Sequence, residues 1–220
     1  MLGMLDVFKN KAHELGLTLV PTEVTQTLNE SELIKLIPQF DGWIIGDDPA
    51  TKQVFDAGKR GSLKAAVKWG IGIDNVDLKA CEALGIPITN TPGMFGQEVS
   101  DIAVGYVIAL ARHTMEIDRG VRKGNWPKPC GISLANRKVA LIGYGDIGRN
   151  TARRLLAADM SVIAYDPYVD PKSIEDGVSL AKWPEQLQEA DFVVVNCALT
   201  TSSYHMLDAV SFAAMKPGVR

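Results

Sequence analysis

Three glycines in the second half of the chain have the spacing of a dinucleotide-binding motif. In VALIGYGDIGRNTARRLL, they follow an apolar run and open a stretch with helical spacing. Gly143 permits a tight turn, Gly145 lets the backbone approach a pyrophosphate, and Gly148 allows a close contact between helix and strand. The N–H groups at the start of the helix then face the phosphates. The residues expected to bind the cofactor here are Gly143, Tyr144, Gly145, Asp146, Ile147 and Gly148.

One acid follows at the distance that this motif requires. Asp166 stands eighteen residues beyond Gly148, at the end of the apolar run SVIAY, where a carboxylate accepts hydrogen bonds from an adenosine ribose. A carboxylate at this point repels a 2′-phosphate, so the expected cofactor is NAD rather than NADP. The alternative is a glycine-rich turn beside a strand-end aspartate, without a ligand. Strand, turn, helix, second strand and acid together favour dinucleotide binding. Asp146 places a negative charge beside the pyrophosphate, which weakens binding unless its side chain points to solvent.

The elements that must position these residues alternate along the chain between short apolar runs and helical stretches. Such alternation is typical of a parallel sheet covered on both faces. Strands are expected at 17–20, 43–46, 64–69, 86–89, 138–143, 161–165 and 192–196. Helices are expected over ESELIKLI, TKQVFDAG and LKACEALG (with Asp77 as N-cap and Gly85 as stop), then at 98–116, 146–158, 183–189 and 207–215.

The predicted fold class is therefore α/β, in two units joined by the long helix that begins near Glu98. We place one domain at residues 1–97 and a second at 98–220. The first unit opens with a helix where a strand normally comes first, and the second breaks off at Val219–Arg220, just after the helix stop at Pro217–Gly218. We therefore expect both domains to be incomplete, the first without its first strand and the second without its C-terminal strands.

The composition excludes several classes of function. The net charge is −3 and no block of basic residues occurs, so neither nucleic acid nor a membrane surface is an expected partner. The longest apolar run, IAVGYVIALA, is about half of the ~20 residues that span a bilayer. Three scattered cysteines without a CxxC pair fit a reducing, cytoplasmic compartment. No His, Cys or acid cluster has metal-ligand spacing, so no metal site is expected.

The chain resembles the D-isomer-specific 2-hydroxyacid dehydrogenases, most closely the D-3-phosphoglycerate dehydrogenases. The resemblance rests on LKAAVKWGIGIDNVDLKACEALGIPITNTPG, VSDIAVGYVIALAR, GNWPKP, VALIGYGDIGRNTARRLLAADMSVIAYDPY and ADFVVVNCALTTSSYHMLDAVSFAAMKPG, which occur in the family's order. It implies a flavodoxin-like substrate domain and a doubly wound Rossmann domain that binds NAD. It also implies oxidation of the CH–OH group of a D-2-hydroxy acid, as in 3-phosphoglycerate to 3-phosphohydroxypyruvate in serine biosynthesis, and a homodimer formed through the NAD-binding domain in the full-length protein.

The resemblance also implies which residues meet the small hydroxy-acid or keto-acid substrate. The loop Gly70-Ile71-Gly72 would present backbone N–H groups to the substrate carboxylate, as glycines at a strand end can. The alternative is an ordinary turn from strand to helix. Lys68 matches a position that is often basic in phosphoglycerate dehydrogenases and would contact a phosphate; the alternative is a surface lysine.

On the cofactor side, the resemblance assigns three more residues. Thr91 matches a position lining the nicotinamide end, and Cys197 and Ala198 match the loop that contacts adenosine and ribose. Ala198 stands where the family usually has proline, which leaves this loop less rigid. Phe95 stands where many members have asparagine, so the family's contact at the start of that helix is not carried over.

No catalytic residue is expected within the 220 residues, because the family's arginine, glutamate and histidine all match positions beyond Arg220. The three histidines (His13, His113 and His205) are expected to be structural or solvent-exposed, with the first and second inside helices. Asp74 and Asp77 are expected in a turn and a helix cap rather than as an acid–base pair. The 220-residue chain alone is therefore expected to be inactive.

Two other functions stay open. One is a glyoxylate or hydroxypyruvate reductase of the same family. The other is a non-catalytic protein that senses NAD by binding it on this fold.

Overall fold

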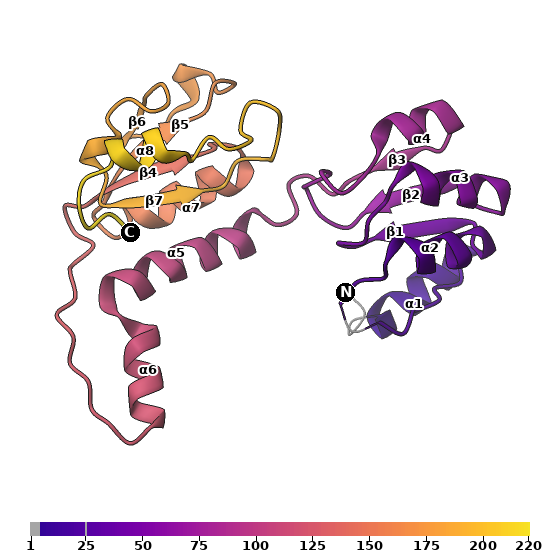
Figure 1. Ribbon diagram of the computed structural model, residues 1–220, viewed down its shortest axis with the longest axis horizontal. Coiled ribbons are helices and arrows are strands. Elements are labelled where there is room, and N and C mark those ends of the chain that lie inside the picture. The colour runs from indigo at the N-terminus through magenta and orange to yellow at the C-terminus, as the bar shows by residue number, and fades with distance from the viewer. Residues whose placement is uncertain (1–4, 25) are drawn as a thin grey trace. The chain divides into compact units, whose positions relative to one another are not determined.

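The computed structural model describes residues 5–24 and 26–220, which contacts divide into two compact units (Figure 1). One unit comprises Met1–Trp69 and Asn75–Thr89, and the other comprises Gly70–Asp74 and Asn90–Arg220. The chain thus leaves the first unit twice, once after β2 and once after β3. The domain boundary that we expect between residues 97 and 98 stays a prediction.

The first unit is built on a three-stranded parallel sheet in the order β1–β2–β3. The strands are β1 (Gly42–Ile45), β2 (Ala65–Lys68) and β3 (Ile88–Thr89), and the helices are α1 (Leu5–Glu14), α2 (Glu30–Leu36) with its 3-10 extension η2 (Ile37–Gln39), α3 (Lys52–Arg60) and α4 (Leu78–Leu84). The core forms where the sheet meets these helices, around Ile45, Val54 and Phe55, which are fully buried.

The helix ends of the first unit follow from local hydrogen bonding. Asn29 and Glu32 form a capping box at the start of α2. The Asp77 carboxylate accepts a hydrogen bond from the Ala80 N–H at 2.9 Å, and Gly85 ends α4 in the left-handed region with φ 61°. The cap and the stop predicted for this helix are both confirmed.

The strand expected at residues 17–20 is wrong. This segment is irregular, and Leu17 and Val20 are 57% and 56% exposed. Pro21 follows directly and has no N–H to give to a ladder, which disfavours a paired strand here. An apolar run with strand propensity forms no strand when no neighbour accepts its hydrogen bonds.

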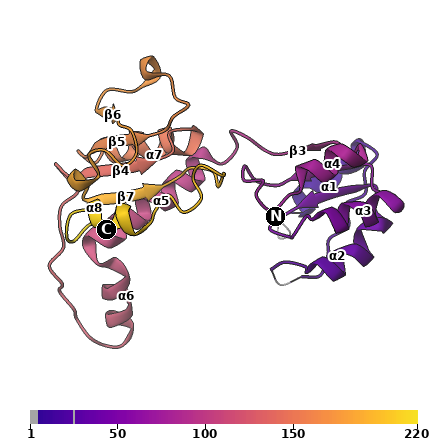
Figure 2. The same cartoon turned by 45° about the horizontal axis from the view of Figure 1, so that its top comes forward.

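The second unit is built on a four-stranded parallel sheet in the order β6–β5–β4–β7 (Figure 2). The strands are β4 (Lys138–Ile142), β5 (Ser161–Tyr165), β6 (Val178–Leu180) and β7 (Phe192–Val195). The helices are α5 (Gly96–Arg112), α6 (Thr114–Arg122), α7 (Asp146–Leu156) and α8 (Ala209–Ala214), with 3-10 turns η3 (Pro171–Ser173) and η4 (Leu187–Glu189). Alternate residues of β4 enter separate cores on the two faces of the sheet: Val139 and Leu141 on one, Ala140 and Ile142 on the other. This is the doubly wound arrangement that the sequence predicts.

Three details of the second unit correct the expected elements. The single helix over 98–116 breaks at His113, which takes φ 56° and separates α5 from α6. The helix over 183–189 is only the 3-10 turn Leu187–Glu189, preceded by Gln186 at φ 61°. The short strand β6, which pairs with β5, was not expected at all. It has only three residues and lacks a continuous apolar run.

The last residues of the sequence lie along the free edge of β7. The Arg220 N–H donates to the Asp191 carbonyl at 3.0 Å, and the Val193 N–H donates to the Arg220 carbonyl at 2.8 Å. These two bonds around Phe192 have the pattern of a parallel ladder. The Lys216 ammonium fixes the preceding turn by an ion pair of 2.8 Å to Asp191.

Candidate cofactor and substrate sites

The three motif glycines occupy three different environments between β4 and α7. Gly143 has φ 91°, and a Cβ there would lie 2.7 Å from the Cys197 backbone. A Cβ on Gly148 would lie 2.1 Å from the Gly143 carbonyl oxygen, because α7 starts directly against the turn. Around Gly145, by contrast, no heavy atom of the described residues lies within 4 Å of the position a Cβ would take. The turn is therefore closed toward the protein and open at Gly145, where a ligand can approach the backbone.

The start of α7 faces this open position. Gly145 is its N-cap and has no side chain to cap the first turn. Helix geometry leaves the first N–H groups without intrahelical acceptors, so they and the helix dipole favour an anion at this end. An eleven-residue helix with an uncapped first turn next to an open glycine fits a pyrophosphate.

The Asp146 side chain is exposed but turned toward the start of α5. Asn150 Nδ2 donates to Asp146 Oδ1 at 3.1 Å, and a Cβ on Gly96 would lie 2.5 Å from the same carboxylate. The carboxylate fits here because Gly96 has no Cβ. The Asp146 carboxylate therefore lies between Asn150, which donates a hydrogen bond to it, and the start of α5.

Asp166 at the end of β5 is tied directly to the glycine turn. Its Oδ2 accepts a hydrogen bond from the Tyr144 N–H at 2.8 Å, and its Oδ1 accepts one from the Tyr168 N–H at 2.9 Å. Each carboxylate oxygen has a further lone pair, so the group can still accept hydrogen bonds from ribose hydroxyls. The structure thus brings the predicted acid and the predicted phosphate turn together.

The loop after β7 closes the same end of the sheet. Cys197 lies against Gly143 through its backbone, and Ala198 is exposed. Burial raises the pKa of the Cys197 thiol, with a further contribution from the charge of Asp166. Asn196 donates to Thr151 on α7 at 2.9 Å, which fixes the start of this loop.

Thr91 and the Gly70–Gly72 loop lie together in the second unit. The Gly70 N–H donates to the Thr91 hydroxyl at 3.0 Å, and the Thr91 N–H donates to the Gly70 carbonyl at 3.1 Å. Asn90 donates to the Ile71 carbonyl at 3.0 Å. Gly72 is half-buried and Ile71 is exposed. The two passages of the chain between units are thus joined, and they bring the predicted carboxylate loop beside the predicted nicotinamide contact.

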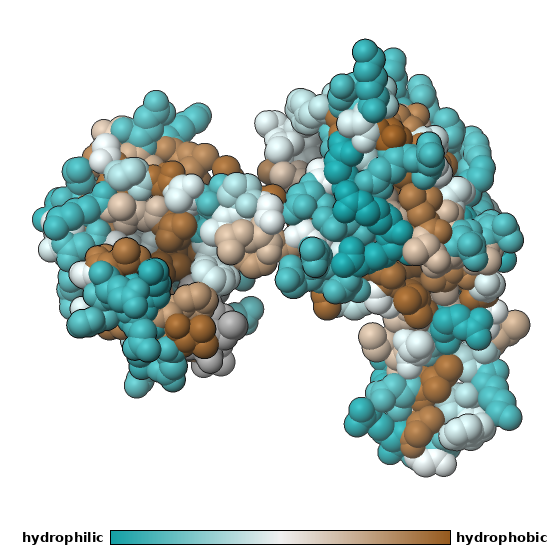
Figure 3. All heavy atoms as spheres, turned by 180° about the vertical axis from the view of Figure 1, so that it is seen from behind, coloured by the Kyte–Doolittle hydropathy of each residue, from teal (hydrophilic) through white to brown (hydrophobic). Residues whose placement is uncertain are grey.

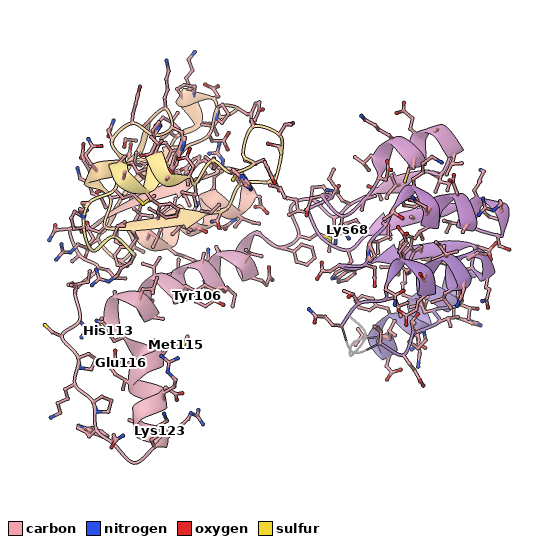
Figure 4. The ribbon with its side chains drawn as sticks, viewed as in Figure 1. Lys68, Tyr106, His113, Met115, Glu116 and Lys123 are labelled. Atoms are coloured by element: carbon pink, nitrogen blue, oxygen red, sulfur yellow. The ribbon has the colours of Figure 1, made fainter. Side chains whose placement is uncertain are left out.

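Lys68 at the end of β2 is a buried lysine, so the surface-lysine alternative is wrong (Figure 4). Its ammonium donates to the Gly46 carbonyl and lies 3.4 Å from the carboxylate of Asp47. The Lys68 side chain is 6% exposed and that of Asp47 is 91% exposed. Burial of an ammonium is costly unless it is paired and hydrogen-bonded; among the described residues Gly46 and Asp47 are the partners of Lys68, and an ammonium has three donors.

The three histidines lie at three separate places, and none is among the predicted cofactor or substrate residues. His13 on α1 is exposed, and exposed His205 has φ 55° and stacks on Tyr204 at 3.9 Å between ring centroids. His113 is not inside a helix but at the break between α5 and α6, where its Nδ1 lies 3.4 Å from the Glu116 carboxylate (Figure 4). The sequence analysis missed this acid partner.

An apolar groove of about 310 Å³ lies elsewhere on the second unit, between α5 and β7. Its lining residues are mainly Val99, Ile102, Tyr106, Leu110 and Val193–Val195. The groove contains none of the predicted cofactor residues. Within the described part of the chain, no cluster of His, Cys, Asp and Glu could hold a metal ion, and no helix is long and apolar enough to cross a membrane.

A parallel doubly wound sheet with an open glycine turn and a strand-end acid defines a dinucleotide-binding domain of the Rossmann type. Residues 104–220 match the family model described as the NAD binding domain of D-isomer specific 2-hydroxyacid dehydrogenases. The chain belongs to this family, and its second unit is an NAD-binding domain.

Individual relatives agree on the family and differ in their reactions. The chain is 34% identical to a hydroxypyruvate reductase of Thermotoga maritima, over 97% of the chain and 70% of that protein. It is 30% identical to D-3-phosphoglycerate dehydrogenase 2 of Arabidopsis thaliana, over 96% of the chain but only 35% of that protein. Among solved structures, the apo form of Escherichia coli D-lactate dehydrogenase superposes with a TM-score of 0.82 at 25% identity, covering 98% of the chain and 68% of that structure.

Proposed function

We propose that the chain is part of an NAD-dependent oxidoreductase that acts on the CH–OH group of a D-2-hydroxy acid. The observation that carries this proposal is the pairing of an open Gly145 with an Asp166 carboxylate held by the Tyr144 N–H. When bound, NAD supplies the hydride acceptor for the carbon that carries the hydroxyl group.

The chain's own residues would bind and orient the two reactants. The turn from Gly143 to Gly148 would hold the pyrophosphate, and Asp166 would accept hydrogen bonds from the adenosine ribose. Cys197 and Ala198 would border the adenosine, and Thr91 the nicotinamide. Backbone N–H groups of Gly70, Ile71 and Gly72 would bind the substrate carboxylate.

Titration calorimetry of the 220-residue chain with NADH and NADPH tests the cofactor assignment. We expect NADH to bind at least about tenfold more tightly, because a 2′-phosphate would face the Asp166 carboxylate at short range. Asp166→Asn should reduce this preference, whereas the matched change Asp159→Asn, on an exposed aspartate beyond α7, should leave it unchanged. Equal affinity of the wild-type chain for the two cofactors would contradict the assignment.

For the substrate, we propose 3-phosphoglycerate, placing the chain in serine biosynthesis, with Lys68 as the phosphate contact. The support is a buried ammonium at the end of β2, which has three donors and, among the described residues, two partners. A second candidate, a plain keto acid such as hydroxypyruvate or glyoxylate, is favoured by the identity to the Thermotoga maritima hydroxypyruvate reductase and by the two partners that already engage Lys68.

Binding of 3-phosphoglycerate against glycerate separates these two candidates. The phosphate role predicts that the wild-type chain prefers the phosphorylated acid and that Lys68→Ala abolishes the preference. Lys64→Ala is the matched control, since Lys64 is an exposed lysine on the same segment that pairs with Asp41 at 2.7 Å. No preference in the wild-type chain, or a preference unchanged in a folded Lys68→Ala chain, would leave the plain keto acid as the better candidate.

We propose that the 220 residues alone do not turn over substrate. Hydride transfer needs a cation at the carbonyl and a general acid–base oriented by a carboxylate. The family resemblance assigns none of these to a residue of this sequence. Purified chain should therefore show no oxidation of NADH with 3-phosphohydroxypyruvate above the buffer rate. NADH binding without turnover is also what a non-catalytic NAD sensor on this fold would show. Turnover would refute the proposal.

We also propose a cytoplasmic homodimer formed through the NAD-binding domain. Apolar side chains of α5 and α6 are exposed, including Ile102 (59%), Tyr106 (60%) and Met115 (52%), and Figure 3 shows apolar surface over the second unit. Patches of this kind on a soluble protein mark interfaces. Light scattering of the full-length protein should give twice the monomer mass, and its Tyr106→Glu variant should give the monomer mass; a monomeric full-length protein would contradict the proposal.

A further inference from the structure

Arg149 connects α7, the helix that starts at the glycine turn, to the segment that follows Asp166. Arg149 stands in the first turn of α7, just after the last motif glycine. Its NH1 donates to the Ser173 carbonyl at 2.8 Å, and its NH2 donates to the Ser173 hydroxyl at 2.9 Å. The guanidinium carbon also lies 4.7 Å from the centroid of the Tyr144 ring, inside the range of a cation–π contact.

Two further contacts join the same two elements. Arg153, one turn further along α7, pairs with Glu175 at 2.9 Å. The fully buried Tyr144 packs in one core cluster with Val169 and Ile174. The segment 166–175 is therefore held against the glycine turn by a set of contacts in which Arg149 contributes two charge-assisted hydrogen bonds and the ring contact.

Further hydrogen bonds of this segment are internal: the Lys172 N–H donates to the Asp170 carboxylate at 2.9 Å and the Ser173 hydroxyl donates to the Asp170 carbonyl at 2.8 Å, within the 3-10 turn η3. They shape the segment but do not join it to α7. Pro167, Asp170 and Lys172 are exposed, and Tyr168 is 88% exposed. A segment with few buried apolar contacts opens locally at low free-energy cost unless polar tethers hold it. Asp166, its first residue, must nevertheless keep its carboxylate at one position to accept a hydrogen bond from a ribose hydroxyl.

We infer that Arg149 is a positioning residue for the adenosine ribose. It does not need to touch the cofactor: it holds segment 166–175 on the turn, and this keeps the Asp166 carboxylate oriented between the Tyr144 and Tyr168 N–H groups. The inference rests on the proposed binding of NAD. It goes beyond that proposal because it assigns the discrimination of the ribose to a residue outside the glycine motif and the acid.

The test compares the binding of ADP and 2′-deoxy-ADP to the 220-residue chain by calorimetry. The two ligands share the adenine and both phosphates, but only ADP has the 2′-hydroxyl that Asp166 would bind. Only ADP can donate the 2′-hydroxyl hydrogen bond to the charged Asp166 carboxylate, so the wild-type chain should prefer ADP by roughly tenfold or more. In Arg149→Ala the preference should fall to about two- or threefold, mainly through weaker ADP binding.

Matched variants distinguish positioning from a general defect. Arg149→Lys keeps the charge but loses the bidentate fork, so it should restore only part of the preference. Arg122→Ala is the control, because Arg122 is an exposed helical arginine that pairs with Asp118 at 2.9 Å. Hydrogen exchange of residues 167–175 should quicken in Arg149→Ala and stay unchanged in the control.

Three outcomes decide between the hypotheses. A wild-type chain that binds neither ADP nor NADH refutes the proposed cofactor binding itself. A wild-type preference that survives intact in Arg149→Ala overturns the positioning role. Equal weakening of both ligands in Arg149→Ala also overturns it, since a direct contact with phosphate or a general loss of structure would act on both alike.

Discussion

Substituting alanine at Gly145 and at Gly148 should separate folding from cofactor binding within one turn. The two positions are three residues apart, and each change adds a single methyl group. At Gly145 the added Cβ meets no heavy atom within 4 Å, and the residue has φ −77°, which alanine adopts readily. At Gly148 the Cβ would lie 2.1 Å from the Gly143 carbonyl oxygen and 2.9 Å from its carbon.

The expected magnitudes follow from these distances. An ordinary Cβ contact begins near 3.4 Å, so Gly148→Ala must move α7 away from the turn by about 1 Å. Overpacking of this kind typically costs about 1–3 kcal/mol of unfolding free energy. Gly145→Ala creates no such contact, and it restricts the unfolded chain, so stability should stay unchanged or rise by about 0.4–1 kcal/mol.

NADH affinity should depend on the two substitutions differently from stability. The Gly145 methyl group would project into the space that the pyrophosphate needs, and each lost hydrogen bond to a charged group costs about 1.5–3 kcal/mol. NADH affinity should therefore fall by roughly ten- to a hundredfold in Gly145→Ala, although the protein is fully folded. In Gly148→Ala, affinity and stability should fall together.

The assay is urea unfolding followed by circular dichroism, with NADH binding measured by calorimetry on the same preparations. Gly105→Ala serves as the control, because Gly105 lies in the middle of α5 with nothing within 4 Å of an added Cβ. Wild-type NADH affinity in Gly145→Ala would show that the phosphates do not approach this glycine. Wild-type stability in Gly148→Ala would show that the close contact between α7 and the turn does not constrain the fold.

Two further predictions concern stability. Tyr144→Phe should be neutral or raise the unfolding free energy by about 1 kcal/mol in urea titrations, because the buried hydroxyl has no hydrogen-bond partner among the described residues, although Glu175 lies near. Burial also raises the pKa of this hydroxyl. A clear loss of stability would contradict this prediction. Burial by itself raises the pKa of Asp191, but the hydrogen bonds and charges of Lys216, Lys138 and Arg137 outweigh it and hold this pKa below 3.8. The stabilisation is therefore present above the usual pKa of an aspartate and is lost as the pH falls through the lowered pKa, so Asp191→Asn should flatten the pH dependence of the unfolding free energy on the acid side; an unchanged slope would count against this ion pair.

The elements around the motif could be predicted because local signals and burial agree there. β4 is apolar from Val139 to Ile142 and lies between two cores, and α7 starts directly after Gly145. Asp77 and Gly85 specify the two ends of α4 through their own hydrogen bonding and backbone conformation. In each of these places the information lies within a few residues of the feature.

The features that the sequence analysis predicted wrongly or left open depend instead on residues that are distant in sequence. Residues 17–20 have strand propensity, but a strand needs a pairing edge elsewhere in the chain. Residues 98–116 have helical spacing throughout. The break occurs because His113 adopts the left-handed region, and nothing about a histidine at this position predicts that conformation. The sequence left open whether Lys68 contacts a phosphate or is a surface lysine, and its burial depends on the Gly46 carbonyl, 22 residues away in sequence. Long-range partners decide these features, and no local pattern reports them.

The geometry around Asp166 explains why a weak motif is informative in this chain. Three glycines at this spacing could form a turn without any ligand, and an aspartate can end a strand for local reasons. Here the acid accepts a hydrogen bond from the residue between the first two glycines, so phosphate turn and ribose acid form one connected unit. Because Gly148 and Gly143 leave no room for a Cβ while Gly145 does, the turn is shaped by contacts on the protein side and unconstrained on the other. A purely structural turn has no need of a glycine on its open side, and this residue is the strongest argument that the turn exists to meet a ligand.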